Sequence, residues 1–264
     1  MIPLAKPNIP EEAKQKVLEV LNSGMLVQGK EVLAFEEKVA TFLNVKHAIC
    51  VLSGTATLHL SLIALNIGHG DEVIVPAFSY VATANVIELV GAKPVFVDID
   101  INTFNIDITK IETAITPKTK AIMPVHEFGL ASDISQIVNL ANKHKLFVIE
   151  DAACALGAQE NNQFVGSFGN LGSFSFHPRK AITSGEGGIV TTNDDFLAKE
   201  IRILRNHGIE IVDGEMDFVR AGYNYRMTDI QAALVSSQFD NIDSSLNYKQ
   251  QLADIYFNEI NNSK

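Results

Sequence analysis

The chain has 264 residues, a hydrophobic content of 47% and a net charge of −10 at pH 7. This length is between about one and two ordinary domains, and the composition excludes a disordered chain. The excess of acidic residues argues against binding to nucleic acid or to an anionic membrane surface. No metal site is expected, because the two cysteines, Cys50 and Cys154, form no CxxC pair.

The N-terminal residues contain no apolar signal core, so we expect a cytoplasmic protein. The uncharged stretch 48–70 is long enough to span a bilayer but too rich in Ser, Thr, Asn and His, and no membrane helix is expected there. Two helices, Pro10–Asn22 and Lys30–Leu43, are predicted next, joined by a loop with two glycines.

From residue 47 onward, short apolar runs alternate with helical segments. The alternation predicts an α/β fold with a mainly parallel seven-stranded sheet flanked by helices, in which ligands bind beyond the carboxyl ends of the strands. The predicted strands are His47–Leu52, Glu72–Pro76, Pro94–Asp98, Lys120–Val125, Lys145–Glu150, Gly172–His177 and Gly188–Thr192, and the helices are Thr55–Asn66, Tyr80–Leu89, Asp133–His144 and Phe196–Asn206. From Thr228 onward the sequence predicts one long helix. We therefore divide the chain into a large domain, 1–228, and a helical segment, 229–264.

Candidate site residues follow three of these strands. Ser53-Gly54-Thr55 is a small turn that opens a helix, where backbone N–H groups and the helix dipole favour a phosphate. The alternative is a tight turn with Ser or Thr as the helix cap. Tyr80 indicates either stacking on a flat ring or simple packing. The pair Glu150-Asp151 ends a wholly apolar strand, where a carboxylate needs a cationic partner or hydrogen bonds, although Asp151 is also a common helix cap.

A further candidate lies in the glycine-rich connection between the last two predicted strands. Lys180 in this loop has the position of a Schiff-base amine, although a solvated surface lysine is the more ordinary reading of it alone. A phosphate cradle, a stacking aromatic, a carboxylate and a lysine are together the parts that hold pyridoxal phosphate.

These residues stand in motifs that resemble the DegT/DnrJ/EryC1/StrS family of sugar aminotransferases, which use pyridoxal phosphate. The resemblance extends from Pro3 to about Ala233. The stretches that carry it are SGTATLHLSL at Ser53, GDEVIVPAFSYVATAN at Gly70, GAKPVFVDID at Gly91, VIEDAACALGA at Val148, GSFSFHPRKAITSGEGGIV at Gly172 and AGYNYRMTDIQAAL at Ala221.

The resemblance implies a type I aminotransferase fold and a homodimer with the active site at the subunit interface. It implies that Lys180 forms the Schiff base and shuttles protons, that Asp151 pairs with the pyridine nitrogen, and that Tyr80 lies on the ring. The residues that it assigns to the phosphate are Gly54, Thr55, Ser175 and, reaching the partner subunit, Asn224, for which a loop asparagine that caps a helix is the alternative. Cys154 replaces the Gln or His that usually stands beside the cofactor ring.

The implied reaction is transamination of a nucleotide-linked keto sugar, with glutamate as the amino donor. Two alternatives stay open. One is a sugar dehydratase on the same scaffold, although related dehydratases carry histidine where this chain has Lys180. The other is a member that binds cofactor or dimerises without turnover, because we expect the small C-terminal domain of the family to be missing from these 264 residues.

Overall fold

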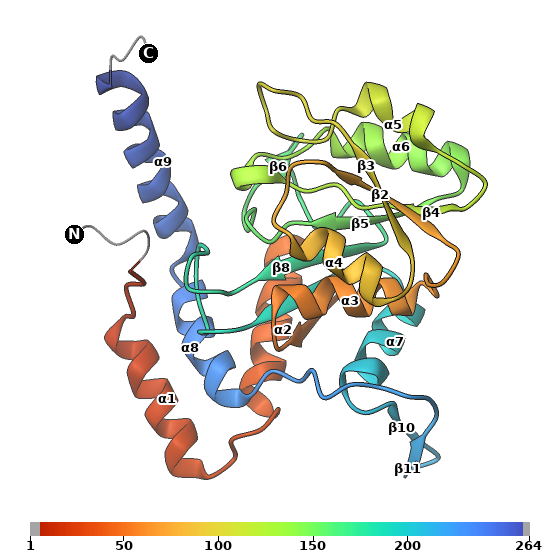
Figure 1. Ribbon diagram of the computed structural model, residues 1–264. Coiled ribbons are helices and arrows are strands. Elements are labelled where there is room, and N and C mark those ends of the chain that lie inside the picture. The colour runs from red at the N-terminus through yellow and green to blue at the C-terminus, as the bar shows by residue number, and fades with distance from the viewer. Residues whose placement is uncertain (1–5, 261–264) are drawn as a thin grey trace.

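The structure is a computed structural model that describes residues 6–260, so the outer ends of the predicted segments 1–228 and 229–264 lie outside the described residues. Its centre is a seven-stranded sheet with the order β1-β9-β8-β5-β4-β2-β3 (Figure 1). The strands are β1 (His47–Val51), β2 (Glu72–Pro76), β3 (Lys93–Val97), β4 (Thr119–Ile122), β5 (Phe147–Asp151), β8 (Leu171–Ser175) and β9 (Gly188–Thr192). The predicted α/β fold with a mainly parallel sheet is confirmed.

The one antiparallel strand of this sheet is β9, which runs against both β1 and β8. β8 and β9 follow one another in the chain without a helix between them, so the chain turns back on itself and the two strands pair in opposite directions. The connecting loop, 176–187, is the segment that carries Lys180. It leaves the sheet at the carboxyl end of β8, beside the carboxyl end of β5.

Helices cover both faces of the sheet (Figure 1). One face packs on α3 (Gly54–Ala64), α4 (Ala82–Leu89) and α7 (Asp195–Arg205), and the other on α2 (Lys30–Leu43), α5 (Ile108–Ala114), α6 (Ile134–His144) and α8 (Asp229–Phe239). Successive strand residues enter opposite layers, as Ile49 and Cys50 of β1 do. Because both faces are buried, interior strands such as β2 are apolar over most of their length.

The N-terminal helices α1 (Glu11–Ser23) and α2 lie beside α8. Asp229, at the start of α8, accepts hydrogen bonds from the N–H groups of Gly29 at 2.7 Å and Val32 at 3.1 Å, so its carboxylate caps α2 from a distant part of the sequence. A Cβ at Gly29 would lie 2.7 Å from Asp229 Oδ2, so a larger residue here would displace the capping carboxylate.

The prediction of one long helix from Thr228 is wrong. The structure has two helices, α8 and α9 (Ile242–Glu259), separated at Asp240 and Asn241. Asn241 leaves helical geometry at φ −112° and ψ 22°, and its carbonyl accepts the N–H of Ser245 at 3.1 Å to begin the next helix. Asp and Asn are also poor helix formers, and the Asp240 carboxylate accepts a hydrogen bond from Lys38 Nζ of α2.

Some short elements are absent from the sequence-based prediction: helix α5, the turn η1 (Glu127–Gly129), and the hairpins β6 (Gln159–Glu160) with β7 (Gln163–Phe164) and β10 (Ile209–Val212) with β11 (Glu215–Phe218). Among residues 6–260, no helix has the length and apolar character needed to cross a membrane.

Candidate active site

The first part of the site is the turn between β1 and α3. Ser53 caps α3, and its Oγ accepts the N–H of Ala56 at 3.1 Å. The helix cap and the phosphate cradle are thus compatible, because the cap leaves the N–H groups of Gly54 and Thr55 without an acceptor among residues 6–260. Ser175, the last residue of β8, lies against this turn: a Cβ on Gly54 would be 2.7 Å from the Cβ of Ser175. The predicted trio of Gly54, Thr55 and Ser175 is therefore brought together.

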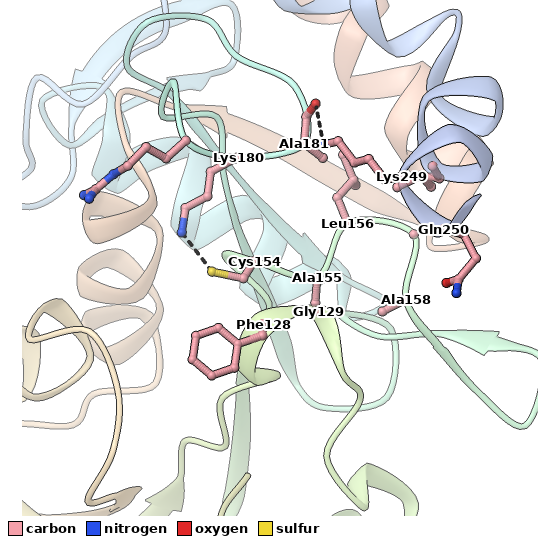
Figure 2. A pocket seen from close by; sticks show the side chains of 13 residues that line it. Phe128, Gly129, Cys154, Ala155, Leu156, Ala158, Lys180, Ala181, Lys249 and Gln250 are labelled. Carbon is pink, nitrogen blue, oxygen red and sulfur yellow. Dashed lines mark hydrogen bonds between the residues drawn. The ribbon is translucent and has the colours of Figure 1, made fainter. Parts of the chain in front are cut away.

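The second part is the loop that holds Lys180. The backbone N–H of Lys180 donates to the carbonyl of His177 at 2.8 Å, and Thr183 Oγ1 donates to the carbonyl of Phe176 at 2.8 Å. These two hydrogen bonds hold Lys180 and Thr183 to the start of the loop. The Lys180 amine donates to Cys154 Sγ at 3.0 Å (Figure 2). The structure therefore places the Cys154 thiol directly beside the candidate Schiff-base lysine.

The third part is Asp151, at the carboxyl end of β5. Its side chain is buried, with 5% of the residue exposed, and accepts hydrogen bonds from Thr83 Oγ1 at 2.8 Å and the N–H of Ala153 at 3.2 Å. Burial raises the pKa of Asp151 above its ordinary value, although these hydrogen bonds and the charge of Lys180 act in the opposite direction. The carboxylate is thus held in place but lacks a cation in direct contact among the described residues.

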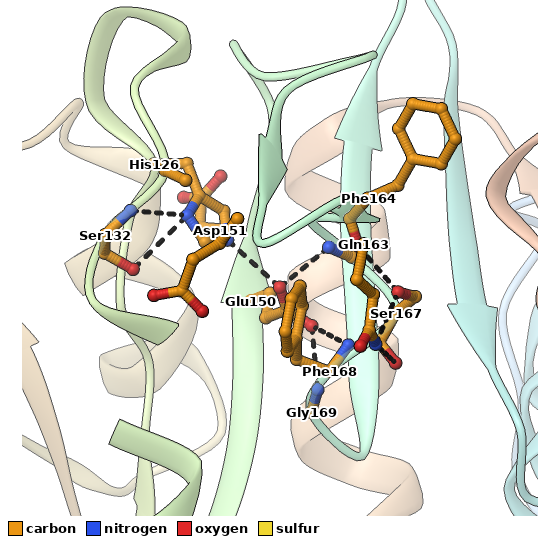
Figure 3. Close-up of polar contacts among 12 residues, drawn as sticks. His126, Ser132, Glu150, Asp151, Gln163, Phe164, Ser167, Phe168 and Gly169 are labelled. Atoms are coloured by element: carbon orange, nitrogen blue, oxygen red, sulfur yellow. Dashed lines mark hydrogen bonds and ion pairs between the residues drawn. The ribbon is translucent and has the colours of Figure 1, made fainter. Parts of the chain in front are cut away.

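Glu150, the neighbour of Asp151, has a different environment. It is fully buried and accepts the N–H groups of Gly166 at 2.7 Å, Phe168 at 2.8 Å and Gly169 at 2.8 Å (Figure 3). Its fourth partner is His126 Nε2 at 3.1 Å. His126 Nδ1 accepts a hydrogen bond from the N–H of Ser132. The ring hydrogen is therefore on Nε2, and the Nε2–H group donates a hydrogen bond to Glu150. Glu150 is therefore a structural anchor for the 166–169 turn.

Tyr80 and Asn224 are less enclosed. Tyr80 is 70% exposed just before α4, and its carbonyl accepts the N–H of Thr83, the residue that binds Asp151. Asn224 is exposed on a segment that pairs with Asn206 at the end of α7. Within residues 6–260 its side chain forms no hydrogen bond with another predicted site residue, although its segment lies beside the β1–α3 turn, since the Leu52 N–H donates to the Tyr225 carbonyl at 2.9 Å and Val51 pairs with Arg226.

Two residues near the site were missed by sequence reasoning, Thr83 and Glu127. Glu127 is buried, its backbone N–H donates to Asn105 Oδ1 at 2.9 Å, and its pKa is raised by burial and by the nearby charge of Asp151. His126-Glu127 directly follows the predicted strand Lys120–Val125, so the strand-end rule alone identifies it. Nothing in the sequence pattern identifies Thr83, which lies in the first turn of α4.

A primary amine, a buried carboxylate and a helix N-terminus thus meet at the carboxyl end of a mainly parallel sheet. The fold and this arrangement define an enzyme of the aminotransferase class. Comparison with known proteins agrees: residues 7–264 match the DegT/DnrJ/EryC1/StrS aminotransferase family, and the chain belongs to that family.

Two relatives and one solved protein show the extent of the likeness. GDP-perosamine synthase of Caulobacter vibrioides is 44% identical over 97% of this chain and 69% of its own length. UDP-N-acetyl-3-dehydro-alpha-D-glucosamine 3-aminotransferase of Acidithiobacillus ferrooxidans is 46% identical over 85% of this chain and 60% of its own length. The PLP form of the putative sugar aminotransferase Spr1654 from Streptococcus pneumoniae superposes with a TM-score of 0.92, at 35% identity, over 97% of this chain and 71% of the other. The family, the type I fold and the class of pyridoxal-phosphate-dependent sugar aminotransferases are confirmed.

Proposed function

We propose that this chain binds pyridoxal phosphate and transfers an amino group from glutamate to a nucleotide-linked keto sugar. The observation that carries the proposal is the placement of the Lys180 amine and the buried Asp151 carboxylate at the same end of the sheet. The names of the relatives support the substrate class, since one is named as the synthase of a GDP-linked sugar and another as an aminotransferase of a UDP-linked sugar.

The residues fit this cofactor chemically. Asp151 is held by hydrogen bonds but has a raised pKa, so a protonated pyridine nitrogen would supply the missing cation. The free N–H groups of Gly54 and Thr55, together with the Ser175 hydroxyl, would hold the phosphate at the positive end of α3. Tyr80 would cover the ring. When bound, the cofactor supplies an aldehyde that reacts with amines and a ring that accepts electrons from the substrate carbon.

Lys180 performs the proton transfers in this proposal. Its Nζ would take a proton from the substrate carbon and hold it for return to the reacting atoms, while the bound cofactor would supply the ring that accepts electrons. Cys154 Sγ, 3.0 Å away, holds the amine in the site in place of the usual Gln or His. One site would serve both substrates in turn, so ping-pong kinetics are expected.

Asn224 and the chain ends complete the proposal. Because the Asn224 side chain is exposed and forms no hydrogen bond with the other site residues among residues 6–260, we assign it to the phosphate of a second subunit, in a homodimer with shared active sites. Light scattering after size exclusion measures this mass directly. We also assign 1–228 to the cofactor-binding domain and 229–264 to the helical segment that leaves it.

The test is steady-state transamination with glutamate and a panel of nucleotide-linked keto sugars. Lys180→Ala should lower turnover by at least about 10³-fold, since it removes both nucleophile and proton carrier. Lys120→Ala, on the exposed side of β4, is the matched control and should retain activity. Comparable turnover by Lys180→Ala and the control would exclude this function, whereas cofactor binding without turnover in the parent would favour a non-catalytic member.

A further inference from the structure

A hollow of about 560 Å³ opens beside Lys180, between the Lys180 loop, the turn after β5 and the first turns of α9 (Figure 2). Its lining includes Lys180 and Cys154 but none of Gly54, Thr55 or Ser175. The hollow is therefore separate from the cradle assigned above to the cofactor phosphate, while it shares the reactive amine with that site.

The charge of this hollow is opposite to that of the whole chain. Arg179, Lys180 and Lys249 line it, and none of its 13 lining residues, all within the described part of the chain, is acidic. The chain as a whole has a net charge of −10. In an acidic protein, a local group of cations attracts an anionic ligand, while the acidic remainder of the surface repels it.

These cations are also available for a ligand. Among residues 6–260, neither Arg179 nor Lys249 forms an ion pair with a carboxylate. Within the same residues, the single polar contact of the Lys249 amine is a long one, 3.4 Å to the carbonyl of Ala181 (Figure 2). Burial lowers the pKa of Lys249, as expected for an amine that has lost part of its water without gaining a counter-ion.

The fold places Lys249 here through a specific contact. Leu246, one helical turn earlier on the same face of α9, packs on Gly157, where a Cβ would be only 2.3 Å from Leu246 Cδ1. Gly157 has a φ of +89°, which a larger residue adopts at a cost. The glycine thus lets α9 approach the turn after β5 closely, and this approach places Lys249 at the wall of the hollow.

We propose that Arg179 and Lys249 bind the diphosphate of the nucleotide-linked substrate in this hollow, and so direct the sugar toward Lys180. A guanidinium and an ammonium are the side chains suited to phosphate oxygens, the first by paired hydrogen bonds and the second as a point charge. Phe128, 72% exposed at the wall of the hollow, provides an apolar side next to the charges. The identity of the ligand as a nucleotide sugar rests on the proposed function, but the preference for a diphosphate does not.

The test is calorimetric titration of protein saturated with pyridoxal phosphate, so that the cradle at α3 is already filled. The probes are inorganic pyrophosphate, GDP, UDP and the uncharged nucleoside uridine. We expect the diphosphates to bind and uridine to bind far more weakly. Lys249→Gln should raise the Kd for pyrophosphate about tenfold or more, as expected for the loss of a hydrogen bond between charged groups. Lys120→Gln, the matched surface control, should leave this Kd unchanged.

Equal Kd values for Lys249→Gln and Lys120→Gln, or no binding of pyrophosphate to the parent, would overturn the proposal. The two proposals fail separately. Pyrophosphate binding that depends on Lys249 would stand even if the chain transaminated no sugar. Transamination with a KM for the nucleotide sugar that Lys249→Gln leaves unchanged would retain the proposed function and remove the diphosphate site.

Discussion

Two neighbouring carboxylates on β5 have opposite surroundings. Glu150 has four hydrogen-bond donors, three of them backbone N–H groups and the fourth a histidine (Figure 3). Asp151 has two, Thr83 and the N–H of Ala153, and a raised pKa. In a strand, adjacent side chains point to opposite faces, so one carboxylate enters the protein interior and the other the site.

The difference shows that the number of hydrogen-bond partners of a buried carboxylate helps to separate a structural role from a role in binding. A carboxylate whose hydrogen-bonding capacity is filled by protein donors stabilises the fold. Removal of the carboxylate or of its donors leaves buried polar groups without partners. A carboxylate that is buried yet short of partners costs stability in the ligand-free protein, which makes it a candidate for binding a ligand. The same strand thus carries one carboxylate that the protein satisfies and one that our proposal assigns to the cofactor.

The largest effect on folding is expected at the Glu150 region. Glu150→Ala leaves three backbone N–H groups and His126 without their acceptor, and should lower the free energy of unfolding by at least about 3 kcal/mol. Asp151→Ala should cost much less, because it also removes an unfavourable buried charge. Urea unfolding of the ligand-free variants measures both. Equal losses would remove the distinction between the two carboxylates.

A smaller effect is expected where the site packs most closely. Gly54→Ala places a Cβ 2.7 Å from the Cβ of Ser175, and should cost about 1–3 kcal/mol by overpacking while weakening binding of pyridoxal phosphate. Gly68→Ala is the control, since its Cβ would meet only the carbonyl of Val90, at 3.4 Å. Thermal unfolding and fluorescence titration measure the two effects. Unchanged cofactor affinity in Gly54→Ala would contradict the assigned phosphate cradle.

The smallest effect is the pH dependence of the ligand-free chain. The folded state raises the pKa of Asp151, so this group contributes stability below the ordinary aspartate pKa and loses it as the pH rises through the folded value. Asp151→Asn cannot ionise, so its stability relative to the parent should increase with pH across that acidic range. Exposed carboxylates such as Asp98 and Glu112 titrate in both proteins and cancel in the difference. A stability difference that is flat or falls with pH would show that the Asp151 carboxylate is already satisfied.

Much of the fold follows from local sequence. Continuous apolar runs located the seven strands, and glycine and serine at the ends of those runs located the β1–α3 turn. The hairpin of β6 and β7 was missed because these strands have two residues each, too few for a periodic pattern. The break at Asp240–Asn241 was missed because apolar residues continue on both sides of it.

The site was less predictable than the fold. The acidic pair Glu150-Asp151 was visible in the sequence, but its division into two roles depends on the turn 166–169, which folds back on Glu150 from later in the chain. The contact between Lys180 and Cys154 likewise joins two loops that are distant in sequence. Lys249 of α9 had no signal at all, because a lone lysine on a helix is an ordinary surface residue.

The most direct test of the central claim, that Asp151 is completed by the cofactor, is the absorbance spectrum of the protein with pyridoxal phosphate before and after glutamate. The parent should show a visible band of lysine-bound cofactor that glutamate converts to the pyridoxamine form. Asp151→Asn should bind the cofactor more weakly and convert it far more slowly, and Lys180→Ala should form no lysine-bound band. A parent without the band, or an Asp151→Asn variant that matches the parent in affinity and conversion, would contradict this claim.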